Sequence, residues 1–300
     1  MTSIDLHLGV HKTASTHLQK YWLSCNALSE GVQCPPLEAV RAHVTPVAAH
    51  AEPAVLRGAR HWLDEACEGR RRVVLSDENI LGSCETNFVR QALYPDARAR
   101  LERIAQLVGE RPLRVLVSVR GYADYLRSAW CEVIRHTPYR PFRESYKGMQ
   151  GLARGWEHVV RDIADALPQA SIECWRYEDL SEVQPAVTAS LFDIDPAQLP
   201  AQDDRRERRS FPRLAVRLLD DIHARHGAGT ATLVRPSVEK IISKPDMARF
   251  DPWAAEEAIA FRRADARSLE ALRALPQVHF LALGRPAQAS TSSTSSREDP

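Results

Sequence analysis

The chain alternates short apolar runs with longer segments in which apolar residues recur at helical spacing. Four apolar runs predict strands, at residues 4–8, 73–76, 113–119 and 171–176. Helical spacing predicts helices over residues 15–28, 97–108, 122–136, 152–166, 211–226 and 253–274. Residues 36–69 are expected to be helix and loop, interrupted by Pro46 and Pro53. Strands separated by helices predict a parallel sheet with helices on both faces.

This pattern extends over most of the 300 residues and stops before a polar tail. Hydrophobic residues make up 44% of the chain, which is ample for a sizeable core. We expect one domain over residues 1–284, folded as a three-layer α/β sandwich around a central parallel sheet. Residues 285–300 are polar and of low complexity, so they are expected to be disordered.

The charges of the chain almost cancel. Forty Lys and Arg residues against 39 Asp and Glu residues leave a formal net charge of +1. This balance excludes a protein built as a polycation for nucleic acid, which would carry a large basic excess. Arginines nevertheless cluster at residues 70–72 and 205–209, so a neutral total can conceal a positive pocket. No stretch of about 18 residues is free of charge, so no membrane span is predicted.

The cysteines and the N-terminal residues predict a reducing compartment. Six cysteines are scattered without any Cys-x-x-Cys, and the first residues lack the basic and apolar regions of a secretory signal. We therefore expect free thiols and a cytoplasmic protein. Cys25, Cys131 and Cys174 lie in apolar runs and are expected in the core.

The first strand, loop and helix carry the groups that an anionic phosphate needs. The strand ends at Gly9, the loop contains Lys12, and Ser15 and Thr16 fall in the first helical turn. The pattern Gly-x-x-x-x-Gly-Lys-Ser/Thr is not matched, because Gly9 lies only three residues before Lys12 and a second glycine is missing. An alternative is that Thr13 or Ser15 merely caps the helix and Lys12 is solvated.

The segment His11-Lys-Thr-Ala-Ser-Thr16, before a helix carrying Leu18 and Gln19, resembles the 5′-phosphosulfate loop of sulfotransferases. These enzymes use 3′-phosphoadenosine-5′-phosphosulfate (PAPS). The resemblance implies that the donor is bound by His11, Lys12, Thr13, Ala14, Ser15 and Thr16. Relatives commonly have glycine where this chain has Ala14, and alanine tolerates fewer backbone angles.

A second motif follows more than a hundred residues later. Arg120 ends an apolar strand, and Ser128 follows within the next helix. The pair is similar to the family's 3′-phosphate motif, in which an arginine fork and a serine hydroxyl grip the phosphate. Each charge-assisted bond contributes about 1.5–3 kcal/mol. An alternative is that Arg120 pairs with nearby Asp124. With both motifs in order, the chain resembles PAPS-dependent sulfotransferases, which implies a P-loop NTPase-like architecture.

Two further segments resemble the family more loosely. Tyr177 begins a Tyr-Glu-Asp-Leu segment after a strand, where relatives often place a tyrosine beside the adenine. The alternative is that this segment caps the helix near Ser181. Arg209 and Ser210 lie where relatives have a late loop that closes over the nucleotide, although a run of charges is more often a solvated face.

Sulfuryl transfer also needs a base, and the strand over residues 73–76 ends in Asp77 and Glu78. Ligands in open α/β sheets bind at the carboxyl ends of strands, and many relatives have Glu or His after this strand. Glu78 is therefore the expected general base, with Asp77 and His11 as alternatives. Lys12, whose charge would lower the pKa of His11, is expected to neutralise the departing bridging oxygen. Asp77 and Glu78 would otherwise cap the next segment.

Two other functions remain open from the same residues. The strand ending in Asp77 and Glu78 also reads as a loose Walker B, which would hold Mg²⁺ in a kinase or NTPase that uses ATP. The imperfect loop and the pair Arg120 and Ser128 weigh against this function. A catalytically inactive nucleotide-binding or scaffold protein is the third possibility. No metal site is expected, since the histidines lack ligand spacing.

The acceptor is less defined than the donor. Cytosolic sulfotransferases that this chain resembles act on hydroxyl groups of carbohydrates, lipids, small phenols or peptides. Residues 36–69 and 138–160 are expected to shape the acceptor pocket, and neither segment carries a recognisable signature.

Overall fold

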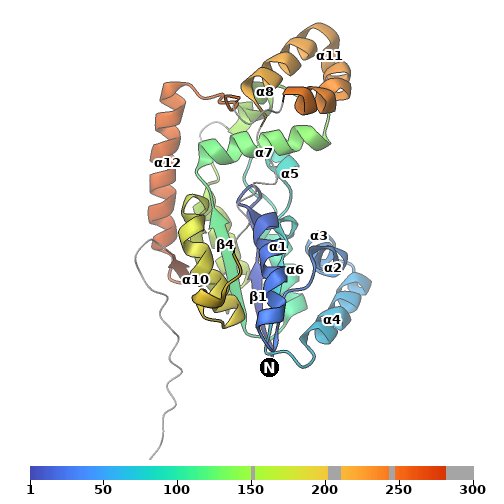
Figure 1. The fold of residues 1–300 in the computed structure, drawn as a ribbon, viewed down its shortest axis with the longest axis vertical. Helices are drawn as coiled ribbons and strands as arrows, with labels where there is room; N and C mark the ends of the chain where they lie inside the picture. Colours follow the sequence, from blue (N-terminus) through green and yellow to red (C-terminus); the bar gives the residue numbers. More distant parts are fainter. Residues whose placement is uncertain (150–152, 202–210, 243–246, 282–300) are drawn as a thin grey trace, which may run out of the picture.

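The computed structural model describes residues 1–149, 153–201, 211–242 and 247–281. Arg209, Ser210 and the predicted tail over residues 285–300 lie outside the described residues. The described part is an α/β fold with a central sheet (Figure 1).

The sheet has six strands in the order β2-β3-β1-β4-β5-β6 within the described ranges, and each neighbouring pair is parallel. The strands are β1 (Ser3–His7), β2 (Val32–Gln33), β3 (Arg72–Ser76), β4 (Leu113–Val119), β5 (Ser171–Arg176) and β6 (Val278–Phe280). The four predicted strands are confirmed as β1, β3, β4 and β5. The edge strands β2 and β6 were not predicted, because two or three residues are too short to show a pattern.

Helices connect the strands and extend the fold beyond the sheet. They are α1 (Ser15–Cys25), α2 (Leu37–His43), α3 (Thr45–Ala49), α4 (Pro53–Cys67), α5 (Cys84–Arg90), α6 (Ala97–Val108), α7 (Tyr122–His136), α8 (Phe142–Tyr146), α9 (Trp156–Ala166), α10 (Leu180–Phe192), α11 (Arg213–Ile242) and α12 (Ala255–Arg273). Short 3-10 turns include η1 (Asn26–Leu28), η2 (Glu78–Ile80) and η4 (Tyr177–Asp179).

Several predicted helix ends differ from the structure. The helices expected over residues 97–108 and 122–136 coincide with α6 and α7. The helix expected over residues 15–28 ends at Cys25 and continues as η1, and that expected from residue 152 begins at Trp156. The helix expected to end at residue 226 continues to Ile242, past a non-helical Gly227 with φ 80°. Glycine tolerates this angle, so the chain kinks and resumes its helix.

The alternation of side chains along the strands divides the core between the two faces of the sheet. Val74 and Leu116 pack with α1 and α10 on one face. Val73 and Val115 pack with α6 and α9 on the opposite face. Figure 1 shows α1 and α10 in front of β1 and β4. The predicted three-layer α/β sandwich with a central parallel sheet is therefore confirmed.

This layering places a switch between the two faces of the sheet at the carboxyl ends of β1, β3 and β4. The connection after β1 crosses one face through α1, whereas those after β3 and β4 cross the other face through α6 and α9. Where neighbouring parallel strands send their helices to opposite faces, a gap forms beyond their carboxyl ends. The segments that follow β1, β3 and β4 meet at this edge.

A buried ion network holds the middle of the sheet. Asp5 on β1 receives two hydrogen bonds from Arg114 on β4, at 2.9 and 2.7 Å, and pairs with Arg72 on β3 at 3.3 Å. Arg114 also reaches Glu173 on β5 at 3.1 Å. Because Asp5 is 2% exposed, its charge is tolerated only through these partners. The network fixes the register of four neighbouring strands.

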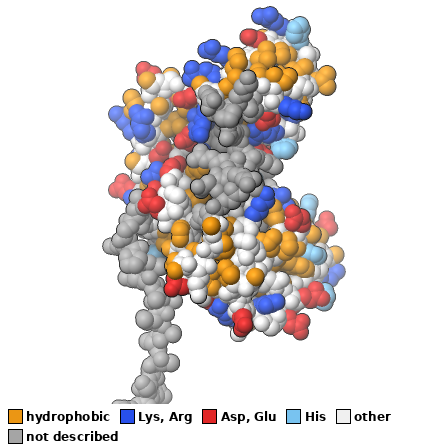
Figure 2. All heavy atoms as spheres, in the orientation of Figure 1, with side chains coloured by type: hydrophobic (Ala, Val, Ile, Leu, Met, Phe, Trp, Pro, Cys, Tyr) orange, Lys and Arg blue, Asp and Glu red, His pale blue; other side chains and the backbone are white. Residues whose placement is uncertain are grey.

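Three further features concern the thiols, the helices and the surface. All six cysteines are free, and Cys25, Cys131 and Cys174 are buried, as expected. None of the helices in the described ranges has the length and apolar character needed to cross a bilayer. Figure 2 shows hydrophobic side chains at the α11 end, where Leu233 and Ile241 are exposed.

The last residue of β1 is a histidine sealed inside the core. His7 is fully buried, its Nδ1 lies 2.8 Å from Ser76 Oγ, and its ring lies 4.8 Å from that of Trp22 and 6.1 Å from that of Trp175. Among the described residues its Nε2 has no partner. Burial lowers the pKa of His7 from 6.5 to about 3, so the folded protein holds the ring neutral.

This lowered pKa predicts a loss of stability in mild acid. The unfolded chain takes up a proton at His7 below about pH 6.5, whereas the folded chain does so only near pH 3. The stabilisation is therefore present above pH 6.5 and is lost as the pH falls. Between pH 6.5 and 5, His7 should account for a loss of about 2 kcal/mol in the free energy of unfolding. Urea titrations of the unmodified protein and of His7→Gln at both pH values measure it.

The contribution of His7 to the loss of unfolding free energy between pH 6.5 and 5 should disappear in His7→Gln. This variant keeps a polar partner for Ser76 but does not titrate. His61→Gln is the matched control, because the side chain of His61 is exposed on α4. An unchanged loss in His7→Gln would show that other groups cause the acid sensitivity.

Candidate functional site

The loop between β1 and α1 turns through three left-handed residues. Gly9, Lys12 and Ala14 have φ angles of 44°, 67° and 64°. Ala14 occupies the N-cap position of α1. A left-handed angle costs a residue with a Cβ about 1–2 kcal/mol relative to the right-handed region. Ala14 thus stands at a position that favours glycine, in agreement with the glycine common in the family that the loop resembles.

The first turn of α1 has no side-chain cap. Thr13 Oγ1 donates to the carbonyl of Val10, and within the described ranges no side chain accepts from the first backbone N–H groups of α1. Ser15 is 5% exposed, and its hydroxyl has no partner among the described residues. The alternative that Thr13 or Ser15 caps this helix is therefore wrong. The helix instead presents unpaired N–H groups and a buried hydroxyl, while Thr16 is exposed to solvent.

Lys12 is paired rather than solvated. Its Nζ lies 3.1 Å from Oε2 of Glu132 on α7, and its side chain is only 17% exposed. Glu132 also lies 3.3 Å from Arg135 and 3.2 Å from the ring of His136. The carboxylate of Glu132 therefore supplies a negative charge to the loop.

Arg120 connects the end of β4 to the same loop. Its Nη1 donates to the carbonyl of Lys12 at 2.6 Å, and its guanidinium lies 4.4 Å from the centre of the Tyr177 ring. Burial lowers the pKa of Arg120, which stays charged at neutral pH. In the described part of the chain its Nε is buried without a partner. Asp124, the alternative partner, forms its ion pair with Arg127 and acts on Arg120 only through a longer-range attraction.

Tyr177 lies beside Arg120, and Ser128 lies on the helix that carries Glu132. Ser128 is buried on α7 one turn before Glu132, so the two share the helix face that meets the loop. Tyr177 opens η4 directly after β5. The helix that follows has no side-chain cap, so the alternative that the Tyr-Glu-Asp segment caps it is wrong.

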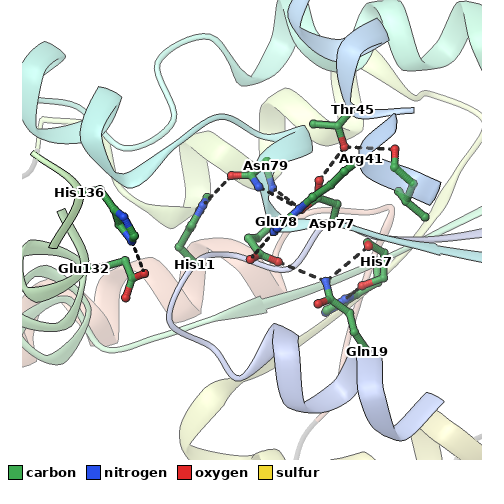
Figure 3. Close-up of polar contacts among 12 residues, drawn as sticks. His7, His11, Gln19, Arg41, Thr45, Asp77, Glu78, Asn79, Glu132 and His136 are labelled. Carbon is green, nitrogen blue, oxygen red and sulfur yellow. Dashed lines mark hydrogen bonds and ion pairs between the residues drawn. The ribbon is translucent and has the colours of Figure 1, made fainter. Parts of the chain in front are cut away.

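The two acidic residues after β3 have different surroundings, which Figure 3 shows. Asp77 is fully buried and accepts hydrogen bonds from Arg41 at 3.3 Å, from Thr45 Oγ1 at 2.6 Å and from the backbone N–H of Asn79 at 3.2 Å. It therefore caps η2, as the capping alternative proposed for it. These hydrogen bonds connect Asp77 to α2, α3 and η2. The role of Asp77 in this site is therefore to hold these three elements in position.

The two carboxylate oxygens of Glu78 accept hydrogen bonds from two different helices. Its Oε1 accepts from Arg41 at 3.2 Å and its Oε2 from Gln19 of α1 at 3.2 Å (Figure 3). The side chain is 15% exposed. Gln19 also reaches the carbonyl of Ser76 at 3.4 Å. The carboxylate is thus held in one orientation between α1 and α2.

His11 is engaged at both ring nitrogens. Nδ1 lies 2.9 Å from the hydroxyl of Tyr94, and Nε2 lies 3.3 Å from Oδ1 of Asn79. The pKa of His11 is lowered, as expected, but burial is the cause rather than the charge of Lys12. With both nitrogens bonded, His11 joins the loop to η2.

The structure thus brings together most of the predicted residues at one sheet edge. Arg209 and Ser210 are not described, and the described residues contain no cluster of three or more His, Cys, Asp or Glu that could hold a metal ion. Sequence reasoning missed the partners Arg41, Thr45, Asn79, Tyr94 and Glu132. Among the residues that hold the predicted ones in place, only Gln19 was indicated by the sequence, because it lies in the helix of the first motif.

The arrangement is suited to a ligand with two separate anionic groups. The uncapped start of α1 offers N–H groups and the Ser15 hydroxyl at one position. Arg120 offers a guanidinium at a second position, joined to the first by its bond to Lys12. Glu78 adds a fixed proton acceptor nearby.

Comparisons with known proteins add little to this geometry. No protein-family model and no curated protein matches the chain. A crystal structure of a sulfotransferase from Alicyclobacillus acidocaldarius is similar with a TM-score of 0.44 and 13% identity, over 81% of this chain and 96% of that one. A similarity of this size does not establish a family.

The tight turn after β1 predicts a specific sensitivity at Gly9. A Cβ added there would lie 2.6 Å from Ser15 Oγ, at a φ angle of +44° that side chains rarely adopt. Gly9→Ala should therefore lower the free energy of unfolding by about 1–3 kcal/mol in a urea titration.

Gly58→Ala is the matched control for this substitution. Gly58 is exposed within α4, and nothing lies within 4 Å of an added Cβ. The change should stabilise the protein by about 0.5–1 kcal/mol, because alanine is the better helix former. Equal effects of the two substitutions would contradict the strained geometry described for Gly9.

Proposed function

We propose that this chain is a sulfotransferase that moves a sulfuryl group from PAPS to a hydroxyl acceptor by direct in-line transfer. The observation that carries the proposal is a pair of buried polar atoms without partners among the described residues, Ser15 Oγ and Arg120 Nε. They belong to two segments that resemble the two phosphate motifs of PAPS enzymes, and a hydrogen bond joins those segments. Buried polar groups normally find partners, and the phosphates of PAPS fit both.

The donor residues divide into two groups under this proposal. The 5′-phosphosulfate would be held by the start of α1 and its loop, residues His11, Lys12, Thr13, Ala14, Ser15 and Thr16. Arg120 and Ser128 would hold the 3′-phosphate, and Tyr177 would lie beside the adenine. Arg209 and Ser210 remain proposed contacts of the same nucleotide. No metal ion is required by this set of residues.

Lys12 would act on the leaving group. When the acceptor oxygen attacks sulfur, the bond from sulfur to the bridging oxygen breaks and negative charge grows on the departing nucleotide. An ammonium group directed at that oxygen stabilises the transition state more than the ground state. Lys12 is now neutralised by Glu132 at 3.1 Å, so the phosphosulfate would compete with this carboxylate for the same cation.

Glu78 would accept the proton of the acceptor hydroxyl. Arg41 and Gln19 hold its two oxygens, which fixes the direction from which the proton can be taken. Asp77 is a weaker candidate because Arg41, Thr45 and Asn79 already occupy it. Both ring nitrogens of His11 are likewise bonded. The acceptor oxygen bonds to sulfur as its proton passes to Glu78.

The alternative ATP-dependent kinase or NTPase would need Mg²⁺ at the end of β3. Its natural ligand there, Asp77, accepts from the Arg41 guanidinium and from the Thr45 hydroxyl. A divalent cation would have to displace Arg41. A catalytically inactive nucleotide-binding protein shares the proposed donor site, and measured turnover distinguishes it from an enzyme.

Nucleotide binding tests the proposal directly. We expect 3′-phosphoadenosine-5′-phosphate to raise the melting temperature of the protein without added metal, and ATP with Mg²⁺ to leave it unchanged. Adenosine 5′-monophosphate should bind at least tenfold more weakly, because one charge-assisted phosphate contact contributes about 1.5–3 kcal/mol. Thermal shift and calorimetric titration measure these differences. Stabilisation by ATP with Mg²⁺ alone would favour the kinase.

Arg120→Ala should remove the preference for the 3′-phosphorylated nucleotide. Arg98→Ala is the matched control, because Arg98 is 56% exposed on α6 and lies outside the proposed site. If Arg120→Ala kept the full preference, Arg120 would not be the 3′-phosphate ligand.

Turnover should separate the residues that act on the reaction from those that bind the donor. Lys12→Met and Glu78→Gln should each lower kcat by about 10²–10³, since each removes charge stabilisation or proton transfer. Affinity for 3′-phosphoadenosine-5′-phosphate should change less than tenfold. Lys240→Met, an exposed lysine on α11, is the control. Equal losses of turnover and affinity would contradict the assigned roles.

A further inference from the structure

A separate pocket lies beside the acidic pair at the end of β3. Its volume is about 220 Å³, and its walls come from α3, η2, α5 and the start of α6. We infer that this pocket binds the acceptor, and that the acceptor is a neutral, polyhydroxylated molecule the size of one sugar ring. The inference rests on the proposed function and narrows the class of its acceptor.

Three residues connect the pocket to the proposed reaction site. Asn79 and Tyr94 line the pocket, and both contact His11, the residue before Lys12. Asn79 also follows Glu78 in the chain. Thr45 lines the opposite wall and bonds Asp77 at 2.6 Å. A molecule in the pocket would therefore contact Asn79 and Tyr94, and these two side chains would stand between it and His11.

Polar side chains outnumber apolar ones among the residues that line the pocket. Eight of its eleven lining residues carry a side-chain nitrogen or oxygen, and Leu81, Gly82 and Pro95 are the remaining three. A flat phenol or a lipid chain would need apolar walls. Hydroxyl groups, such as those of Ser83 and Thr86, can donate and accept further bonds besides the 2.9 Å contact between them. Such walls match a ligand with several hydroxyl groups.

The charges in the pocket favour a neutral ligand. Asp96 is exposed at its rim and makes no cap bond to α6. Arg100 donates at 2.8 Å to the carbonyls of Ile80 and Asn79. The guanidinium is thus occupied by backbone, and the pocket lacks a surplus positive charge for an acidic acceptor. A carboxylate such as that of Asp96 commonly accepts from sugar hydroxyls.

The volume limits the size of the ligand. Since a water molecule occupies about 30 Å³ of liquid, 220 Å³ corresponds to roughly seven waters. A single sugar ring has comparable bulk, and a larger acceptor would extend out of the pocket, which is open to solvent. The segment expected to line the acceptor pocket over residues 138–160 contributes nothing to this one, while Thr45 lies in the other expected segment, 36–69.

A pair of substitutions on α5 tests the pocket in the full-length protein. Thr86→Phe would fill it, whereas Glu85→Phe places the same ring on the exposed neighbour, which does not line it. The probes are D-glucose, D-galactose and 4-nitrophenol as acceptors with PAPS as donor. Saturation-transfer NMR with each sugar provides a binding signal that does not depend on turnover.

We expect sulfation of at least one sugar at a kcat/KM more than tenfold above that of 4-nitrophenol. Thr86→Phe should lower sugar turnover at least tenfold and remove the NMR signal, while Glu85→Phe changes neither. The thermal shift with 3′-phosphoadenosine-5′-phosphate should survive in both variants, which shows that they fold.

One set of results would overturn the acceptor assignment, and a different result would overturn the proposed function. Transfer to 4-nitrophenol but not to sugars, or a sugar signal that Thr86→Phe leaves intact, would refute the acceptor assignment and leave the proposed function standing. No binding of 3′-phosphoadenosine-5′-phosphate, with a sugar signal that only Thr86→Phe removes, would refute the proposed function and support the pocket as a sugar site.

Discussion

The hydrogen bond from Arg120 to the carbonyl of Lys12 is the contact on which the candidate site depends. It spans 2.6 Å and joins residues 108 positions apart. It forms because β1 and β4 are parallel neighbours, so the segments after them begin at the same edge of the sheet. A guanidinium fixed on the loop backbone keeps the left-handed Lys12 in place. The start of α1 and the arginine therefore form one rigid surface with two anion-binding positions.

The charged side chains at this end of the sheet contact opposite charges within the fold. Glu132 pairs with Lys12, and the single guanidinium of Arg41 contacts both Asp77 and Glu78. This pairing explains why a net charge of +1 gives no sign of the site. Partly buried charges are costly without partners, so each pair preserves a charged group until a ligand replaces the partner. The proposed polyanionic donor would be such a ligand for Lys12, and release of Glu132 would be part of the cost of binding it.

The sequence contained the strands, the two motifs and the layering, but not the partners that hold the site. The segment Leu113–Val119 was predictable because three of its seven residues are β-branched valines and two more are leucines, which gives a strong local pattern. Glu132 was not, because it lies 120 residues from Lys12 and only the packing of α7 brings them together. The different roles of Asp77 and Glu78 were equally hidden, since Arg41 and Thr45 belong to helices whose positions no local pattern fixes.

Gln19 couples the two sides of the proposed reaction. It lies on α1, whose first turn would bind the donor, and it bonds Glu78, which would deprotonate the acceptor. Under the proposed function, one helix would fix both the position of the sulfuryl group and the orientation of the base. In-line transfer requires the attacking oxygen and the leaving oxygen on opposite sides of sulfur, so an error in either position slows the reaction. A rigid helix between the two positions keeps their separation constant, whereas two independent loops would not.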